Sequence, residues 1–136
     1  MKPPKIRAIA IDFDGVIHSY SKGWHDGTCY GEPVAGARAA IEELFQTHHV
    51  FIFSTRDPQT IVNWCHKHWP ELDVRVVPPI EPNAPPFFNG PFIGVTSQKL
   101  AAIAYIDDRA ITFRGDWNEV FKGVFAMSND GVGTKH

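Results

Sequence analysis

The sequence predicts an α/β fold, a doubly wound parallel sheet with helices on both of its faces. Short β-branched runs alternate along the chain with amphipathic segments, and parallel strands need crossover connections of this kind. The chain has 136 residues, of which 43% are hydrophobic and 21% are charged, which is enough to bury one core. We therefore expect a single domain, residues 1–136, in which residues 126–136 form a flexible tail.

The first strand is predicted over Lys5–Ile11, a β-branched run that meets two acidic residues, Asp12 and Asp14. The segment Val16–Glu32, called the flap below, is rich in Gly, His, Ser and aromatic residues and has no clean period. This composition predicts a loop with a small hairpin that lies over a neighbouring part of the molecule.

Two helices and a second strand follow the flap. Apolar residues recur at helical spacing over Pro33–Thr47 and predict an amphipathic helix. His49–Phe53 is predicted as a buried strand. Asp57 is suited to cap a second helix, which begins at Pro58 and ends before Pro70.

The middle of the chain is predicted to contain a third strand, Asp73–Val77, and then a stiff loop. Six of the fourteen residues from Pro78 to Pro91 are proline, which excludes both a helix and a central strand. Thr96 or Ser97 then caps a short predicted helix that carries Lys99.

A fourth strand is predicted over Ile103–Ile106 and is followed by a second acidic pair, Asp107 and Asp108. A fifth strand over Ala110–Phe113 and a last helix over Trp117–Phe125 complete the expected elements.

Polar residues follow the predicted strands and are expected to meet at one edge of the sheet. Sites in open parallel sheets lie outside the carboxyl ends of the strands. Carboxylates brought together there repel one another, and oxygen ligands without nearby His or Cys favour Mg²⁺. A lysine and a hydroxyl can bind a phosphoryl group, while one Asp attacks phosphorus and its neighbour protonates the leaving oxygen. The residues expected to converge are Asp12, Asp14, Ser54, Lys99, Asp107 and Asp108.

Charge and cysteine content limit the other function classes. Thirteen Lys plus Arg against fifteen Asp plus Glu give a net charge of -2, so nucleic acid is expected only as a substrate. No apolar run is long enough to span a membrane, and the N-terminus shows no signal-peptide pattern. Cys29 and Cys65 lie far apart in the sequence and favour free thiols, so we expect a cytoplasmic protein.

Four short segments together resemble the haloacid dehalogenase (HAD) superfamily. Asp12-Phe13-Asp14-Gly15-Val16, after a hydrophobic strand, is similar to motif I of that family. Ser54 at a strand end resembles motif II, Lys99 resembles motif III, and Ile106-Asp107-Asp108 resembles motif IV. The four segments occur in the family's order and cover Ile6–Phe113. The resemblance implies a Rossmann-like HAD core with the strand order 5-4-1-2-3, counted along the chain.

The resemblance also implies a covalent mechanism. In it Asp12 forms an aspartyl-phosphate and Asp14 is the general acid and base, while Ser54 and Lys99 bind the phosphate. Family members with a second Asp two positions after the first resemble phosphatases and phosphotransferases, not dehalogenases.

Four aspartates are implied to hold Mg²⁺. Asp12 contributes its side chain and Asp14 its backbone carbonyl, and Asp107 and Asp108 complete the metal site. We expect Asp108 to be the direct ligand, and Asp107 to act through a water molecule or as a partner of Lys99.

Substrate contacts are expected around this centre. Backbone N–H groups of the turn that contains Phe13 and Gly15 are expected to form an anion nest. Thr55 and Arg56 come directly after the motif II serine, and Arg56 either reaches the substrate or forms a salt bridge at the rim. Trp24 in the flap either stacks on a base or sugar or packs within a small hairpin.

The two intervals in which the family places its cap domains have room only for the flap and a proline-rich loop. These intervals are Gly15–Pro33 and Pro78–Thr96, so the chain resembles capless members, and more distantly small members carried by phages and bacteria. We expect the flap and the loop to bound the mouth of the site.

The resulting prediction is a Mg²⁺-dependent phosphohydrolase that acts on phosphate monoesters, small or macromolecular. The substrate expected first is a nucleotide or a nucleic-acid-end phosphate. A small sugar phosphate or a phosphoprotein is the second expectation. The alternative is a non-catalytic phosphate-binding or receiver-like regulatory module. Receiver domains carry their phospho-acceptor after the third strand, whereas Val77 is followed here by Pro78.

Overall fold

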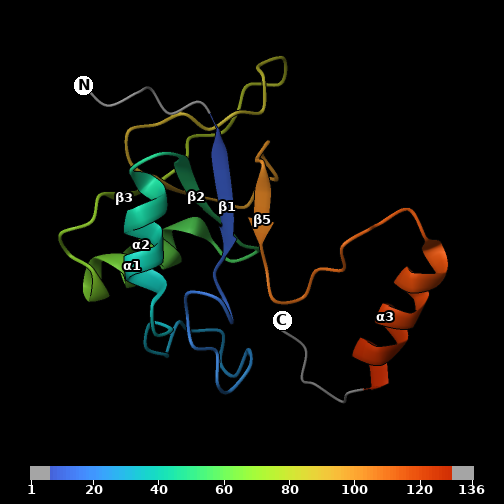
Figure 1. Ribbon diagram of the computed structural model, residues 1–136. Coiled ribbons are helices and arrows are strands. Elements are labelled where there is room, and N and C mark those ends of the chain that lie inside the picture. The colour runs from blue at the N-terminus through green and yellow to red at the C-terminus, as the bar shows by residue number, and fades with distance from the viewer. Residues whose placement is uncertain (1–6, 130–136) are drawn as a thin grey trace.

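The computed structural model of the protein describes residues 7–129 and contains a five-stranded parallel sheet (Figure 1). The strands are β1 (Ala8–Asp12), β2 (His49–Phe53), β3 (Val74–Val76), β4 (Ile93–Thr96) and β5 (Ala104–Ile106). Their order across the sheet is β3-β4-β2-β1-β5, and each neighbouring pair is parallel. The predicted α/β class with a parallel sheet is confirmed.

Two helices cover one face of the sheet. α1 (Ala37–Phe45) buries Ile41 and α2 (Pro58–His68) buries Ile61 and Trp64 in a core that includes the inward side chains of β1 and β2. α1 begins later than predicted because Gly36, with a φ of 86°, holds the turn before it in a left-handed conformation. No helix within residues 7–129 is long and apolar enough to cross a membrane.

The opposite face of the sheet is covered by loops, so the prediction of helices on both faces is wrong. Ala10 and Phe51 of the sheet pack there against Phe88 and Leu100, which belong to the connections around β4. The Phe88 ring lies so close to Gly94 of β4 that a Cβ at this position would overlap it. Loops replace helices on this face because the connection before β4 is too rich in proline to be helical.

β4 was not predicted from the sequence, and its presence changes the strand order. It lies between β2 and β3, so that the third predicted strand is still an edge strand but no longer pairs with β2. Pro91 precedes β4 and Gly94 interrupts it, and both residues disfavour a strand locally. All four residues of β4 are buried, so tertiary packing overrides this local preference. The predicted order 5-4-1-2-3 is therefore wrong, although β2, β1 and β5 are neighbours as expected.

The fifth predicted strand, Ala110–Phe113, does not form. After β5 the chain leaves the sheet and continues to α3 (Trp117–Asn129), which stands apart from the sheet in Figure 1. Ile111 lies against Gly123 of α3, so its apolar side chain contacts that helix. The segment thus packs toward α3 and not against the edge of β5. α3 reaches into the expected tail, whose residues 130–136 lie outside the described part of the chain.

The connection between β4 and β5 is also not the predicted short helix. The hydroxyl of Thr96 accepts a hydrogen bond from the backbone N–H of Gln98 over 3.0 Å and closes a tight turn. The hydrogen bond is of the kind that caps a helix, but no helix follows it, and Lys99 lies on a loop.

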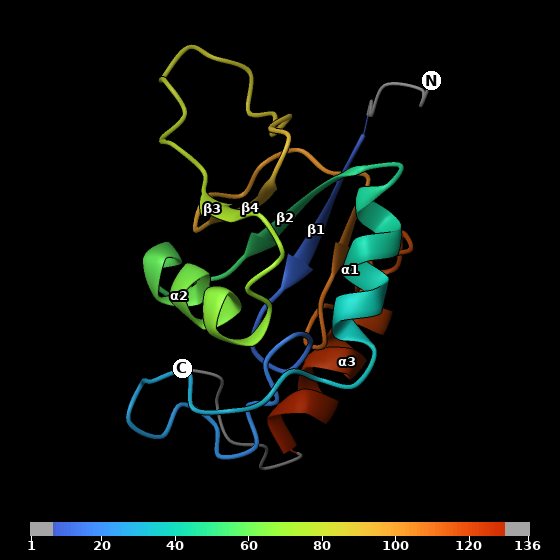
Figure 2. The ribbon, with the colours of Figure 1, turned by 90° about the vertical axis from the view of Figure 1, so that its left-hand side faces the viewer.

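The proline-rich loop lies at the other end of the sheet from the flap (Figure 2). Phe87 and Phe88 line a hollow together with Arg7 and His49, which stand at the amino ends of β1 and β2. The expectation that this loop bounds the mouth of the site is therefore wrong, and the flap is the loop at the carboxyl ends.

Candidate active site

Three carboxylates gather at the carboxyl ends of β1 and β5. Asp12 ends β1, and Asp107 and Asp108 follow β5, whose Ile106 pairs with Ile11. One oxygen from each of the three side chains lies within 4.8 Å of the others. Asp12 is half-buried, whereas Asp107 and Asp108 are exposed. Strand pairing thus creates an acidic cluster at the edge of the sheet where the sequence predicts a metal site.

The carboxylates in the cluster are positioned by their own backbone. One Asp12 oxygen accepts a hydrogen bond from the N–H of Phe13, and one Asp107 oxygen accepts a hydrogen bond from the N–H of Arg109, both over 2.9 Å. Asp108 lies against Gly15, which has a φ of 84° and no side chain to fill the space. An all-oxygen donor set with room beside it suits a hard divalent cation.

Asp14 lies next to the cluster in the sequence, but its carboxylate has other partners. One oxygen accepts a hydrogen bond from Nδ1 of His18 over 2.9 Å, and the other accepts one from Nε of Arg56 over 2.8 Å. Burial raises the pKa of Asp14, but the hydrogen bonds from His18 and Arg56 and the positive charge of Arg56 lower it by more, so the net pKa lies below its ordinary value. The structure therefore favours the ionised form of Asp14.

His18 is a positioning residue that the sequence analysis did not include in the site. It is fully buried and its ring stacks on Phe13 with an interplanar angle of 4°. Its Nε2 accepts a hydrogen bond from the N–H of Gly31 over 2.8 Å, so Nδ1 carries the proton that is donated to Asp14. The sequence did contain one indication of this contact, because His18 follows Asp14 by four residues. The turn that contains Gly15 brings the two side chains together.

Arg56 is buried and connects Asp14 to the flap. Besides Asp14, it binds the carbonyl oxygen of Gly27 through Nη1 over 2.8 Å. The Trp24 ring lies 4.6 Å from the guanidinium carbon. One of the two roles expected for Arg56 was a salt bridge at the rim of the site. The salt bridge is present, but it lies in the interior and joins Asp14, the predicted general acid, to the flap.

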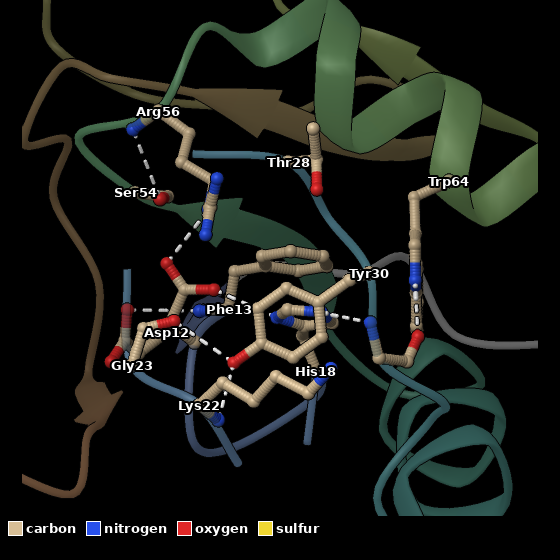
Figure 3. A network of polar contacts seen from close by, with 12 residues as sticks. Asp12, Phe13, His18, Lys22, Gly23, Thr28, Tyr30, Ser54, Arg56 and Trp64 are labelled. Carbon is tan, nitrogen blue, oxygen red and sulfur yellow. Dashed lines mark hydrogen bonds and ion pairs between the residues drawn. The ribbon is translucent and has the colours of Figure 1, made fainter. Parts of the chain in front are cut away.

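Ser54 and Thr55 occupy different environments after the end of β2, and Figure 3 shows Ser54 beside Arg56. Ser54 is buried, and its hydroxyl oxygen accepts a hydrogen bond from the N–H of Arg56 over 3.2 Å. Its own N–H donates to the carbonyl oxygen of Thr96 over 3.2 Å. Thr55 is exposed. Ser54 thus fixes the turn that presents Arg56.

The turn after β1 does not form the expected anion nest. The N–H of Phe13 binds Asp12, the N–H of Gly15 binds the carbonyl oxygen of His18, and the N–H of Val16 binds that of Phe13. These three donors already have acceptors within the chain. The Phe13 side chain is fully buried in the core.

Lys99 lies on the exposed connection before β5. Its ammonium group stands over the Tyr105 ring, 5.5 Å from the ring centroid. Tyr105 lies in β5 on the same face as Ala10 and two positions before Asp107, so the lysine is placed on the side of the sheet from which Asp12 projects.

Hydrogen bonds within the flap and to α2 hold the flap in place (Figure 3). Trp64 of α2 donates a hydrogen bond to the carbonyl oxygen of Gly31, and the Tyr30 hydroxyl donates one to that of Gly23, both over 2.9 Å. Trp24 at the tip is 41% exposed and has one face against Arg56. The flap consists mainly of turns, and the antiparallel pairing expected of a hairpin is limited to its two ends, where His18 forms a bridge with Pro33 and the N–H of Ser19 donates to the carbonyl oxygen of Glu32.

Comparison with known proteins adds no family to this description. No family model, no curated protein and no solved structure matches the chain.

Proposed function

We propose that the protein is a Mg²⁺-dependent phosphohydrolase of the HAD type that hydrolyses phosphate monoesters through an aspartyl-phosphate. The observation that carries this proposal is the grouping of Asp12, Asp107 and Asp108 at the carboxyl ends of two paired strands. Three carboxylates at this separation repel one another, and a bound cation would remove that repulsion.

The residues present fit Mg²⁺. Side-chain oxygens of Asp12, Asp107 and Asp108 would hold the ion, together with the backbone carbonyl of Asp14. When bound, the ion would offset the negative charge of the carboxylates and of a substrate phosphate.

In the proposed reaction, a carboxylate oxygen of Asp12 attacks phosphorus while the bond to the ester oxygen breaks. The leaving oxygen takes a proton, and water then attacks the phosphorus of the aspartyl-phosphate, releasing phosphate and restoring Asp12. Asp14 would exchange these protons. Because Arg56 and His18 favour its ionised form, Asp14 is better prepared to accept the proton of water than to protonate a poor leaving group.

Ser54 and Lys99 are proposed to bind the phosphate. Lys99 has the freedom to do so, because its ammonium group is exposed and rests on an aromatic ring. Ser54 is more constrained, since its hydroxyl oxygen is already an acceptor for Arg56, but the hydroxyl proton can still be donated.

We further propose that the site is capless and open. Within residues 7–129, neither the interval from β1 to α1 nor the interval from β3 to β4 contains a helix or strand of its own. Hollows of about 710 and 470 Å³ lie along α1 and at the amino ends of the strands, and neither is lined by Asp12, Asp107 or Asp108. An open site suits a large phosphomonoester, and a nucleotide or nucleic-acid-end phosphate is the substrate we propose.

The test is turnover of an aryl phosphate with and without Mg²⁺. Asp12→Asn keeps the shape of the side chain but cannot attack phosphorus, so it should lose turnover while the far-ultraviolet circular dichroism is unchanged. Asp116→Asn is the matched control, because Asp116 caps the turn before α3 and Asn caps equally well. Wild-type turnover by Asp12→Asn would exclude the covalent mechanism, and absence of turnover by the native protein would favour the non-catalytic phosphate-binding or receiver-like alternative.

A further inference from the structure

The guanidinium group of Arg56 has one nitrogen without a partner. Nε binds Asp14 and Nη1 binds the carbonyl oxygen of Gly27, but Nη2 is buried and has no hydrogen-bond partner among the described residues. The side chain is only 3% exposed. Buried donors are almost always hydrogen-bonded, so this nitrogen calls for an acceptor that comes from outside the chain.

The cover over Arg56 is formed by the flap. Rings of Trp24 and Tyr20 lie 4.6 and 5.8 Å from its guanidinium carbon. Tyr20 and His25 have φ angles of 33° and 49°, in the left-handed region that side chains other than glycine rarely adopt. Strained backbone of this kind is typical of segments that change conformation at functional sites. Trp24 is 41% exposed, so its side of the cover can move without breaking a buried contact on its outer face.

Arg56 also contacts the residue that is proposed to act on the leaving group. Its direct partner is Asp14, the residue proposed to exchange protons with the leaving oxygen. Nε of Arg56 binds Asp14 over 2.8 Å, so Nη2 of the same guanidinium group would be near the leaving part of a bound substrate. A second negative charge on the leaving group would therefore meet the Arg56 cation.

We infer that Arg56 is a specificity-determining residue whose Nη2 binds a second anionic group on the leaving part of a phosphomonoester. Trp24 moves off the guanidinium group when such a substrate binds, and the phosphate oxygen takes its place. The favoured substrates are phosphomonoesters that carry a further phosphate or phosphodiester near the scissile ester. This inference rests on the proposed phosphohydrolase function and narrows its substrate class.

The experiment uses substrates that differ by one charge. One pair is thymidine 5′-phosphate with either a methyl phosphodiester or a methyl ether at the 3′ oxygen. The second pair is thymidine 3′-phosphate with either of the same two groups at the 5′ oxygen. For one of the pairs, kcat/KM of the native protein should be at least about tenfold higher for the diester, as expected for one hydrogen bond to a charged group.

Three variants then locate the effect. Arg56→Lys keeps a cation beside Asp14 but loses the planar set of N–H donors of the guanidinium group. The diester preference, which is the ratio of kcat/KM for the diester to kcat/KM for the ether, should therefore fall to about two or less. Arg75→Lys is the matched control, because Arg75 is exposed on the edge strand β3 and pairs with Asp73, and it should keep the preference. Trp24→Ala should keep or increase the preference, since it uncovers Arg56.

The possible failures are distinguishable. If the native protein hydrolyses the aryl phosphate but shows no diester preference, or if Arg56→Lys keeps the preference, the inference is wrong and the proposed function stands. Loss of the preference in folded Trp24→Ala also overturns the inference, because Trp24 itself would then contact the substrate. Absence of turnover with every ester and Mg²⁺ overturns both proposals. Should Arg56→Lys fail to fold, the native ratio and the Trp24→Ala ratio decide.

Discussion

Gly15 and Asp108 lie in contact across the site, although they are far apart in the sequence. A Cβ on Gly15 would overlap a carboxylate oxygen of Asp108, and the φ of 84° at Gly15 already favours glycine. The glycine after the second aspartate of the turn therefore provides the space in which the carboxylate of Asp108 stands.

Gly15→Ala is expected to weaken Mg²⁺ binding, because the added methyl group displaces the Asp108 carboxylate. The matched control is Gly36→Ala, which has nearly the same φ, 86°, but no atom within 4 Å of the added carbon. Both variants carry the backbone strain of about 1–2 kcal/mol, so both should lose stability in urea unfolding. The Mg²⁺ concentration for half-maximal activity should rise only in Gly15→Ala. An equal rise in both variants would mean that strain, and not the contact, is responsible.

Asp108→Asn is expected to raise the Mg²⁺ requirement more than Asp107→Asn does. One oxygen of Asp107 is already engaged by the N–H of Arg109, whereas Asp108 stands in the space beside Gly15. Titration of activity with Mg²⁺, supported by calorimetric binding, measures the difference. The reverse ranking would make Asp107 the direct ligand.

Ca²⁺ is expected to inhibit the Mg²⁺-supported reaction. Ca²⁺ accepts more ligands than Mg²⁺ and can take both oxygens of Asp12, which would withhold the nucleophile. Steady-state rates at fixed Mg²⁺ and increasing Ca²⁺ provide the measurement. Full activity after exhaustive chelation, with no metal in the preparation, would exclude the proposed metal site.

His18→Ala is expected to destabilise the protein by about 2–4 kcal/mol, because it leaves the half-buried Gly31 N–H and one oxygen of the buried Asp14 without their His18 partner. The ring contact with Phe13 is lost as well. Urea unfolding measures the change. His25→Ala, at an exposed position of the flap, is the control and should remain within about 0.5 kcal/mol of the native protein. Similar losses in the two variants would show that His18 does not anchor the flap.

Cys65 is expected to make stability fall in alkaline solution. Its thiol is fully buried, and this burial, with a smaller effect of Cys29, raises its pKa from 9.0 to about 12. As the pH rises, the Cys65 thiol ionises in the unfolded chain before it ionises in the folded protein. The stability contributed by the neutral buried thiol is therefore complete below pH 9 and is lost as the pH rises toward 12. The slope is about 1.4 kcal/mol per pH unit.

The corresponding measurement is urea unfolding of the native protein and of Cys65→Ala at several pH values from 7.5 to 10.5. The cavity left by the variant lowers its stability by a constant amount at all pH values. Only the native protein should show the additional alkaline loss. Parallel pH profiles would mean that Cys65 ionises equally in the folded and unfolded states.

Local sequence patterns were sufficient to predict β1, β2, β3 and β5, the three helices, and the acidic residues that follow β1 and β5. These are local properties, since periodicity and strand-end composition depend on neighbouring residues. Because neighbouring parallel strands end at the same edge of a sheet, Asp12 was correctly expected to meet Asp107 and Asp108.

Long-range contacts, in contrast, fix the position of β4, the loop-covered face of the sheet and the partners of Asp14. Burial of β4 and the space for Phe88 beside Gly94 depend on segments that are distant in the sequence. In the same way, Arg56 and His18 reach Asp14 only because β2 pairs with β1 and the turn after β1 closes. Local propensity carries no information on such long-range contacts, and they determine which carboxylates are available to a metal and which is held by the flap.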